Sequence, residues 1–299
     1  MLSSEIFGIK LKNPTILASG ILGSTGGTLK RVANYGAGAL TTKSLGVKAR
    51  EGHNNPSIVE LEDGLINAIG LANPGYRAYE EEIKIAKKGN IPIFGSVYGY
   101  TVDEFIEVAK GLEKFGVNAV ELNFSCPNVD NAGVKFGHSP DLSFEVASKV
   151  KKKLHIPVIA KLTPNVKDIV DIAKACEEAK VDGITAINTI SAMKIDTRIG
   201  KPVLGNKTGG LSGPCLKPIG VRCVYEIAKE VNTPIIGCGG ITTGEDAVEY
   251  FMAGASAVQI GTGVYSRGVS IFKKITEEIK VFMKEEGYQD FKEMIGIAI

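Results

Sequence analysis

Eight short apolar runs, spread through the whole chain, constrain the fold more than any other feature of this sequence. Most are continuous in apolar residues rather than alternating, which is typical of strands buried on both faces of a parallel sheet. Helical patterns occupy most of the intervals between them. The runs are Thr15–Ser19, Ala39–Ser44, Ile93–Val97, Ala119–Ser125, Val158–Leu162, Ile184–Thr189, Ile235–Gly239 and Ala257–Thr262.

The intervals carry recognisable helix signals. The pairs Thr101/Glu104 and Thr242/Glu245 are predicted capping boxes, in which a hydroxyl and a carboxylate three residues apart satisfy free N–H groups of a first helical turn. A third helical pattern covers Lys167–Lys180. Strands and helices therefore alternate along the chain.

The residues that precede the runs also alternate in type. The odd-numbered runs follow an X-Pro pair, whereas runs two, four and eight follow a glycine turn and run six follows the variant Val181-Asp182-Gly183. Proline is tolerated at the first residue of a strand, and glycine closes the preceding helix. Odd and even strands supply alternate side-chain layers in a closed barrel. We therefore expect a (β/α)8 barrel rather than an open doubly wound sheet, in a single domain over residues 1–299, with a short β-hairpin (EIFGIKLKNP) ahead of the first strand.

Composition argues against several other classes of protein. The net charge of +2 gives no electrostatic case for nucleic acid or an anionic membrane. No stretch approaches the roughly 18 apolar residues of a transmembrane helix, and the first residues do not resemble a signal peptide. The five cysteines are odd in number and lack a CxxC spacing, so we expect reduced thiols in a cytoplasmic protein, with no disulfide framework and no metal site.

The carboxyl ends of the runs are unusually polar, and in a (β/α)8 barrel the active site lies at this rim. Core packing does not explain so many polar or glycine residues on one edge, so we predict a binding or catalytic site there. The residues concerned are Ser19, Lys43, Ser44, Ser96, Asn123, Lys161, Asn188, Thr189, Gly239, Gly240, Gly261 and Thr262.

Two lysines lie inside or at the end of apolar strands. A buried ammonium needs a partner, and a phosphate, a flavin or a carboxylate would serve for Lys43 and Lys161. A solvated face is the simpler interpretation, but the pattern VIAKL argues against it for Lys161. The glycine loops after the last two strands are expected to bind a phosphate, without indicating which one.

Two loops are further candidates. Cys126, followed by proline in a loop over the barrel mouth, is either an acid/base or nucleophilic residue or a buried structural thiol. The loop from Asn67 to Gly75 could present amide groups to a small planar polar ligand, although a plain turn explains it almost as well.

Several ordered motifs resemble those of the soluble dihydroorotate dehydrogenases. They are TTKS, NAIGLANPG, ELNFSCPN, INTI and GGLSGPCLKPIG, together with the two glycine loops, and they extend from about residue 3 to residue 270. The resemblance implies oxidation of (S)-dihydroorotate to orotate in pyrimidine biosynthesis with bound FMN. It also implies that Cys126 removes the C5 proton while hydride passes from C6 to the flavin; the membrane-bound class has a serine there and an N-terminal extension.

The resemblance also implies ligand contacts. Those to the substrate are Lys43, Asn67, Ala68, Ile69, Gly70, Leu71, Asn123, Asn188 and Thr189. Those to FMN are Ser19, Lys43, Ser44, Ser96, Asn123, Lys161, Ile187, Gly213, Gly239, Gly240, Gly261 and Thr262, with Lys161 near the flavin N1/O2 edge. Two positions depart from the pattern: Ser96 stands where many relatives have Asn, and Ile69 where another subclass carries Met.

Within the soluble class, this chain resembles the NAD-linked subtype. That resemblance implies a homodimer associated with a subunit carrying FAD and an iron–sulfur cluster, in a heterotetramer, whereas the other soluble subtype reduces fumarate as a homodimer. We also expect Ser125–Asp141 to act as a lid.

Four alternatives remain open. They are an FMN-barrel reductase of another pyrimidine, a tRNA dihydrouridine synthase, a phosphate-binding aldolase with Lys161 as a Schiff base, and a non-catalytic binding module.

Overall fold

Eight parallel strands close into a barrel, in the order β3-β4-β7-β8-β9-β10-β15-β16 and back to β3. The computed structural model describes residues 2–124 and 136–299. Each strand overlaps one of the predicted runs, so the predicted (β/α)8 barrel is confirmed. The strands are β3 (Thr15–Leu17), β4 (Ala39–Thr41), β7 (Ile93–Val97), β8 (Ala119–Asn123), β9 (Val158–Lys161), β10 (Gly183–Ala186), β15 (Ile235–Cys238) and β16 (Ala255–Ile260).

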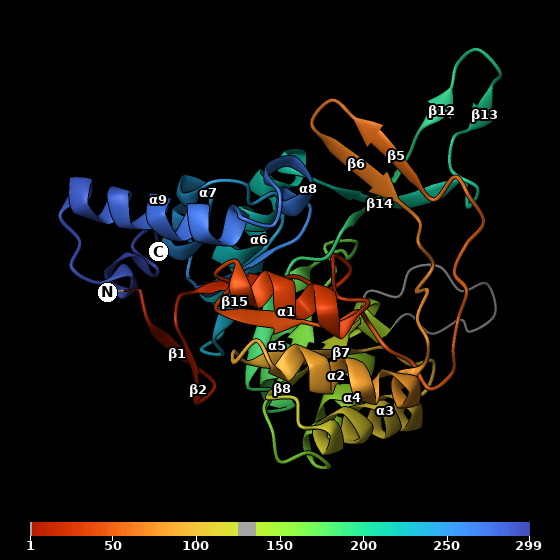
Figure 1. The fold of residues 1–299 in the computed structure, drawn as a ribbon, viewed down its shortest axis with the longest axis horizontal. Helices are drawn as coiled ribbons and strands as arrows, with labels where there is room; N and C mark the ends of the chain where they lie inside the picture. Colours follow the sequence, from red (N-terminus) through yellow and green to blue (C-terminus); the bar gives the residue numbers. More distant parts are fainter. Residues whose placement is uncertain (1, 125–135) are drawn as a thin grey trace.

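Helices connect the strands and surround the barrel (Figure 1). Within the described residues, no helix is both long enough and apolar enough to cross a membrane. The α-helices are α1 (Gly26–Asn34), α2 (Glu80–Lys87), α3 (Val102–Phe115), α4 (Pro140–Lys151), α5 (Ile169–Glu178), α6 (Lys217–Ala228), α7 (Gly244–Met252), α8 (Gly263–Arg267) and α9 (Ile271–Glu286). Short 3-10 turns lie at Tyr76–Tyr79, Phe136–His138, Pro214–Leu216 and Phe291–Met294.

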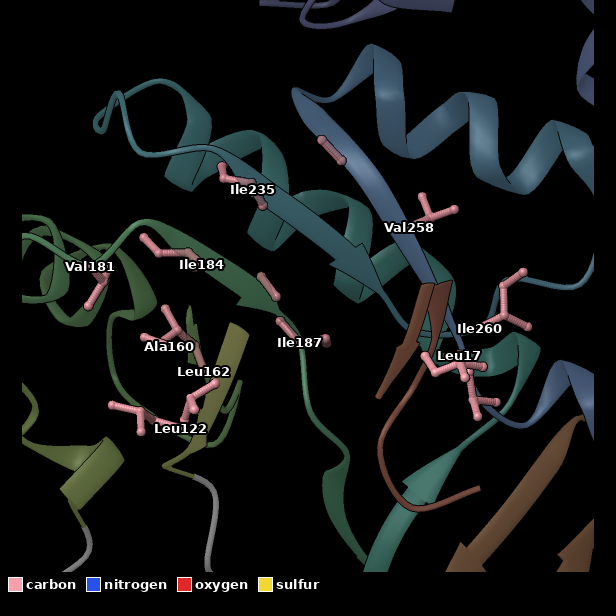
Figure 2. Packing of buried hydrophobic residues seen from close by; sticks show 14 of the residues in the cluster. Leu17, Leu122, Ala160, Leu162, Val181, Ile184, Ile187, Ile235, Val258 and Ile260 are labelled. Atoms are coloured by element: carbon pink, nitrogen blue, oxygen red, sulfur yellow. The ribbon is translucent and has the colours of Figure 1, made fainter. Parts of the chain in front are cut away.

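Neighbouring residues along most barrel strands belong to two different apolar clusters. Ile16, Phe94 and Ile236 are among the residues that pack together inside the barrel, whereas the residues next to them along the strands pack against the helices. Figure 2 shows part of this outer layer, with Leu122 on β8 and Val258 on β16 among its members. Successive side chains of a strand point to opposite faces, so both faces are buried and the runs are continuous in apolar residues.

The predicted N-terminal hairpin is present and covers one end of the barrel. Strands β1 (Ser4–Ile6) and β2 (Ile9–Leu11) pair antiparallel, and Ile6 and Leu11 belong to the inner apolar cluster. The turn between them carries Phe7, whose ring lies where a side chain at Gly183 would be, 2.3 Å from the position of its Cβ. The hairpin therefore closes the barrel near the first residues of its strands.

The helix starts differ in detail from the predicted capping boxes. The Thr101 hydroxyl accepts from the Glu104 N–H as predicted, but the Glu104 carboxylate accepts from Tyr100 rather than from Thr101. The box of α7 consists of Thr243 and Asp246, so the prediction of Thr242 and Glu245 was wrong by one residue. The carboxylate of Asp246 accepts from the N–H groups of both threonines, which the exposed Glu245 does not do. Helix α5 begins at Ile169, two residues inside the predicted Lys167–Lys180.

Two excursions from the barrel form a sheet that the sequence analysis did not predict. Strands β5 (Ile58–Leu61) and β6 (Gly64–Asn67) follow β4, and β11 (Ile190–Met193) and β14 (Thr208–Ser212) follow β10; they combine in the order β11-β14-β6-β5. A small hairpin of β12 (Ile195–Asp196) and β13 (Lys201–Pro202) lies between β11 and β14 in the chain. Figure 1 shows the β5/β6 and β12/β13 hairpins together beyond the barrel.

Candidate active site

A cavity of about 380 Å³ opens at the carboxyl ends of the barrel strands and extends to the added sheet. It brings together most residues that the sequence analysis proposed as ligand contacts. Those that line it are Ser19, Lys43, Ser44, Asn67, Ala68, Ile69, Gly70, Leu71, Asn123, Lys161, Ile187, Asn188, Thr189, Gly213, Gly239, Gly240, Gly261 and Thr262.

One proposed ligand contact is not among the described residues that line the cavity. Ser96 is completely buried behind the rim, where its hydroxyl lies 2.9 Å from the hydroxyl of Ser44. Any influence of Ser96 on a ligand would therefore pass through Ser44. Cys126 lies outside the described residues, as does most of the predicted lid.

A chain of hydrogen bonds links polar side chains across the rim. The hydroxyls of Ser19 and Ser44 are 3.2 Å apart, and the Asn123 amide donates to Ser44 at 3.2 Å. The Asn188 amide donates to the Asn123 carbonyl at 3.2 Å, and its own carbonyl accepts from the Thr189 N–H at 2.8 Å. These contacts join the ends of β3, β4, β8 and β10, so the side chains are oriented by one another before any ligand binds.

The loop that follows β6 is held against the cavity by side chains on its outer side. Arg50 Nε donates to the Gly70 carbonyl at 2.6 Å, and Asn73 Nδ2 donates to the Leu71 carbonyl at 2.7 Å. Leu71 adopts a left-handed φ of 57°, a conformation that a leucine rarely takes. Because this loop lines the cavity, it is more than the plain turn that the sequence alone allowed.

Lys161 is buried at the floor of the cavity, with 4% of its surface exposed. Its ammonium donates to Gln259 Oε1 at 2.7 Å, and it lies 3.8 Å from Cys238 Sγ and 4.0 Å from Glu121 Oε1. Burial lowers the pKa of Lys161, whereas negative charge on the neighbouring Cys238 or Glu121 raises it, and the net direction is upward. The interpretation of Lys161 as part of a solvated face is therefore wrong.

Lys43 has a different environment. Its side chain is half-buried, and its ammonium makes no hydrogen bond or ion pair with any residue in the described ranges. Burial lowers the pKa of Lys43, because the charged form loses hydration. Such a cation, facing a cavity, suits an anionic ligand.

The glycine loops that follow β15 and β16 line the cavity at the rim. Gly239 and Gly240 have φ values of +132° and +68°, and a Cβ at Gly240 would lie 2.7 Å from the backbone nitrogen of Lys217. Among the described residues, a Cβ at Gly261 would instead meet only the Cβ of Ala18, at 3.6 Å. The fold therefore requires glycine at 240, whereas at 261 it leaves room that a ligand can occupy.

Several residues that line the cavity were not predicted from the sequence. His53, Ile58, Glu60 and Leu65 line the cavity from the added sheet and its connection, so they could not be found without predicting that sheet. Below the floor, Glu121 and Gln259 are also completely buried inside strands. The signal that singled out Lys161, a polar residue in an apolar run, could have found both.

The sequence of this chain matches a known protein family and several named relatives. The family profile described as "Dihydroorotate dehydrogenase" matches residues 1–283. A protein of Methanocaldococcus jannaschii named "Dihydroorotate dehydrogenase B (NAD(+)), catalytic subunit" is 53% identical, over 100% of this chain and 98% of the relative.

Proteins of the same name in two other organisms are similarly close. The one from Thermoplasma acidophilum is 51% identical over 100% of this chain and 99% of the relative. The one from Pyrococcus abyssi is 50% identical, also over 100% of this chain and 99% of the relative. From the matched profile and these full-length similarities, we conclude that the chain belongs to the dihydroorotate dehydrogenase family.

Proposed function

We propose that this protein catalyses the FMN-dependent oxidation of (S)-dihydroorotate to orotate in de novo pyrimidine biosynthesis. The observation that carries the proposal is the cavity, because it collects at one place nearly all the residues that the family resemblance assigns to flavin and substrate. The relatives named as dihydroorotate dehydrogenases are similar over their whole length, which supports the same substrate class.

The residues at the rim fit FMN. A cavity of about 380 Å³ lies within the range of small-molecule sites. The backbone at Gly239, Gly240 and Gly261 lines the cavity and suits a phosphate, and the buried cation of Lys161 suits the polar edge of a flavin ring. The proposed contacts are Ser19, Lys43, Ser44, Asn123, Lys161, Ile187, Gly213, Gly239, Gly240, Gly261 and Thr262, with Ser96 acting through Ser44. FMN, when bound, accepts the hydride that leaves C6 of the substrate.

The side chains of this chain supply the remaining chemistry. The amides of Asn67, Asn123 and Asn188 bind the polar edges of the substrate ring, and the Lys43 ammonium binds its carboxylate. The backbone of residues 68–71 and the Thr189 hydroxyl complete that side of the cavity. Cys126, as thiolate, removes the C5 proton. Lys161 provides positive charge where negative charge develops.

We further propose that electrons leave through a second subunit. The relatives are named NAD-linked catalytic subunits, which supports a partner. In this proposal two catalytic chains associate with subunits carrying FAD and an iron–sulfur cluster, in the cytoplasm, and NAD is the final acceptor. Fumarate is the alternative acceptor.

The first test is spectroscopic. The purified protein is expected to be yellow and to lose its visible flavin absorption when dihydroorotate is added without oxygen. Subsequent addition of NAD with the partner subunit, or of fumarate, then identifies the acceptor. A yellow protein that does not bleach would contradict the substrate. A colourless protein that takes up no FMN would contradict the cofactor and favour an aldolase that uses Lys161.

The role of Cys126 has its own test. Cys126→Ser is expected to retain FMN but to be reduced by dihydroorotate at least about 100-fold more slowly near neutral pH, because a hydroxyl is a poorer base than a thiol. The deficit should shrink as the pH rises. Stopped-flow absorbance measures the rate. The matched control is Cys176→Ser, at a buried cysteine of helix α5 that is not among the residues lining the cavity. Reduction at the wild-type rate would rule out this assignment.

A further inference from the structure

A layer of polar side chains crosses the barrel between the inner apolar cluster and the cavity floor. It consists of Thr41, Glu121, Lys161, Thr185 and Gln259, from five different strands, each at most 4% exposed. Gln259 and Glu121 come from opposite sides of the barrel, since β3, β4 and β7 separate β16 from β8 in one direction and β15, β10 and β9 in the other. Their contact therefore spans the interior.

Glu121 is the centre of this layer. Its Oε2 accepts from Gln259 Nε2 at 2.5 Å and from the Thr185 hydroxyl at 2.9 Å. Its Oε1 is buried and accepts no hydrogen bond from the described residues. The ammonium of Lys161 lies 4.0 Å from that oxygen. A buried carboxylate oxygen without a hydrogen-bond donor is costly. A buried cation nearby can offset part of that cost, so the contact between Glu121 and Lys161 is a candidate stabilising pair.

The groups around Lys161 indicate which one offsets its buried positive charge. Among the described residues, the ionisable groups beside its ammonium are Cys238 and Glu121. Burial raises the pKa of the Cys238 thiol, so at neutral pH Cys238 is uncharged. Gln259 donates to Glu121 and accepts from Lys161, which ties the two ionic groups together, but it carries no charge itself. Glu121 is then the negative charge that offsets Lys161.

We propose that Glu121 is a positioning residue: it keeps the Lys161 ammonium charged and keeps it directed from the floor into the cavity. Lys161 can donate three hydrogen bonds, and Gln259 and Cys238 receive two of them. The third donor is left for the cavity that Lys161 lines. The part of this inference that concerns the flavin rests on the proposed function, whereas the pairing of the two charges does not.

The pairing is tested by unfolding. Glu121→Gln and Lys161→Met each remove one member of the pair, so the remaining group must either stay charged without its partner or be neutralised, and both variants are expected to lower the urea midpoint of the apoprotein strongly. The double variant leaves neither charge and is expected to recover most of that loss. Losses that simply add would overturn the proposal. If Glu121→Gln alone does not fold, recovery of folding in the double variant supports the proposal and failure to recover contradicts it.

The charge of Lys161 is tested by redox titration of the flavin-loaded protein with dithionite and a reference dye. In Glu121→Gln, burial is expected to remove the Lys161 proton near neutral pH. When two electrons then enter the flavin, one extra proton moves from solvent to Lys161 Nζ. The slope of potential against pH therefore steepens by one proton per two electrons, about 30 mV for each tenfold change in proton concentration.

Thr185→Val is the matched control, because it removes one hydrogen bond to Glu121 and leaves its charge. Its slope should equal that of the wild type. Equal slopes in Glu121→Gln and the wild type would show that Glu121 serves packing alone and would overturn the proposal. A protein without flavin would contradict the proposed function instead, and the unfolding cycle would still decide the pairing.

Discussion

At the scale of single residues, Gly261 is a position where the fold tolerates a side chain but a bound ligand would not. Within residues 2–124 and 136–299, a methyl group there meets only Ala18 Cβ, at 3.6 Å. We therefore expect Gly261→Ala to leave the melting temperature unchanged and to weaken FMN binding by roughly tenfold or more, because overpacking a fitted contact costs about 1–3 kcal/mol. Fluorescence titration of the apoprotein measures the affinity. Gly27→Ala is the control, because no described atom lies within 4 Å of its added Cβ. Equal FMN affinities of Gly261→Ala and the wild type would place the phosphate elsewhere.

Lys43 should distinguish the substrate from the cofactor. Its half-buried ammonium has no partner among the described residues, so an anionic ligand gains a charge-assisted contact without first breaking one. Lys43→Ala is expected to weaken orotate binding by roughly 10–100-fold and FMN binding by less, since hydrogen bonds to charged groups contribute about 1.5–3 kcal/mol. Spectral titrations of both ligands measure this, with the exposed Lys48→Ala as control. Equal losses for the two ligands would argue against a specific role toward orotate.

Residue-level prediction from the sequence succeeded where a side chain conflicts with its surroundings. A lysine in the apolar run VIAKL signals burial, and Lys161 is indeed buried. Its partners could not be named, because Gln259 lies 98 residues away in the chain and on a strand three places round the barrel. Which polar groups meet inside a barrel depends on strand order and register together, and no local pattern contains either.

At the scale of elements, Asp246 at the start of α7 binds both the loop after β15 and the first residue of α6. The Asp246 carboxylate accepts from Thr242 and Thr243 and forms an ion pair with Lys217 at 2.9 Å. Partial burial alone would raise its pKa, but the hydrogen bonds from Lys217 and from the threonines lower the pKa of Asp246 to about 2. These contacts fix the backbone that follows Gly239 and Gly240 at the rim.

Asp246→Asn is therefore expected to reduce the free energy of unfolding by roughly 2 kcal/mol at neutral pH. Because the folded pKa lies below the unfolded value, this contribution is complete above about pH 5 and declines as the pH falls through about 4 toward 2. Urea unfolding at several pH values measures it, with Glu245→Gln as the exposed control. A difference between Asp246→Asn and wild type that does not depend on pH would contradict the ionic origin.

Elements were predictable when their sequence pattern was local. The barrel strands are buried on both faces, which leaves a continuous apolar run in each. Strands β5 and β14 carry no such run, because half or more of their residues are exposed or partly exposed. Their pairing also depends on distant segments, since Gly210 of β14 lies opposite Asn67 of β6. The sheet that completes the cavity was therefore missed, and with it His53 and the other residues it contributes.

At the scale of the whole molecule, the two ends of the barrel have different tasks. One end is closed by the β1/β2 hairpin and filled by apolar side chains, the middle holds the buried charged layer, and the other end opens into the cavity. The apolar side chains at the closed end exclude water from that side of the buried Glu121 and Lys161. The stability of the closed end and the binding properties of the open end should therefore be separable by substitution.

Ile6 tests that separation, because it lies in the hairpin, is 4% exposed and packs in the inner cluster. Ile6→Ala is expected to destabilise the protein by about 2–5 kcal/mol through lost burial and a residual cavity, while FMN affinity stays within about twofold. Urea unfolding followed by circular dichroism and by flavin fluorescence should give one shared, lowered midpoint. Ile195→Ala, at a site that is 52% exposed in the β12/β13 hairpin, should change stability by no more than about 0.5 kcal/mol. If Ile6→Ala unfolds like the wild type, the hairpin only covers the barrel and does not support it.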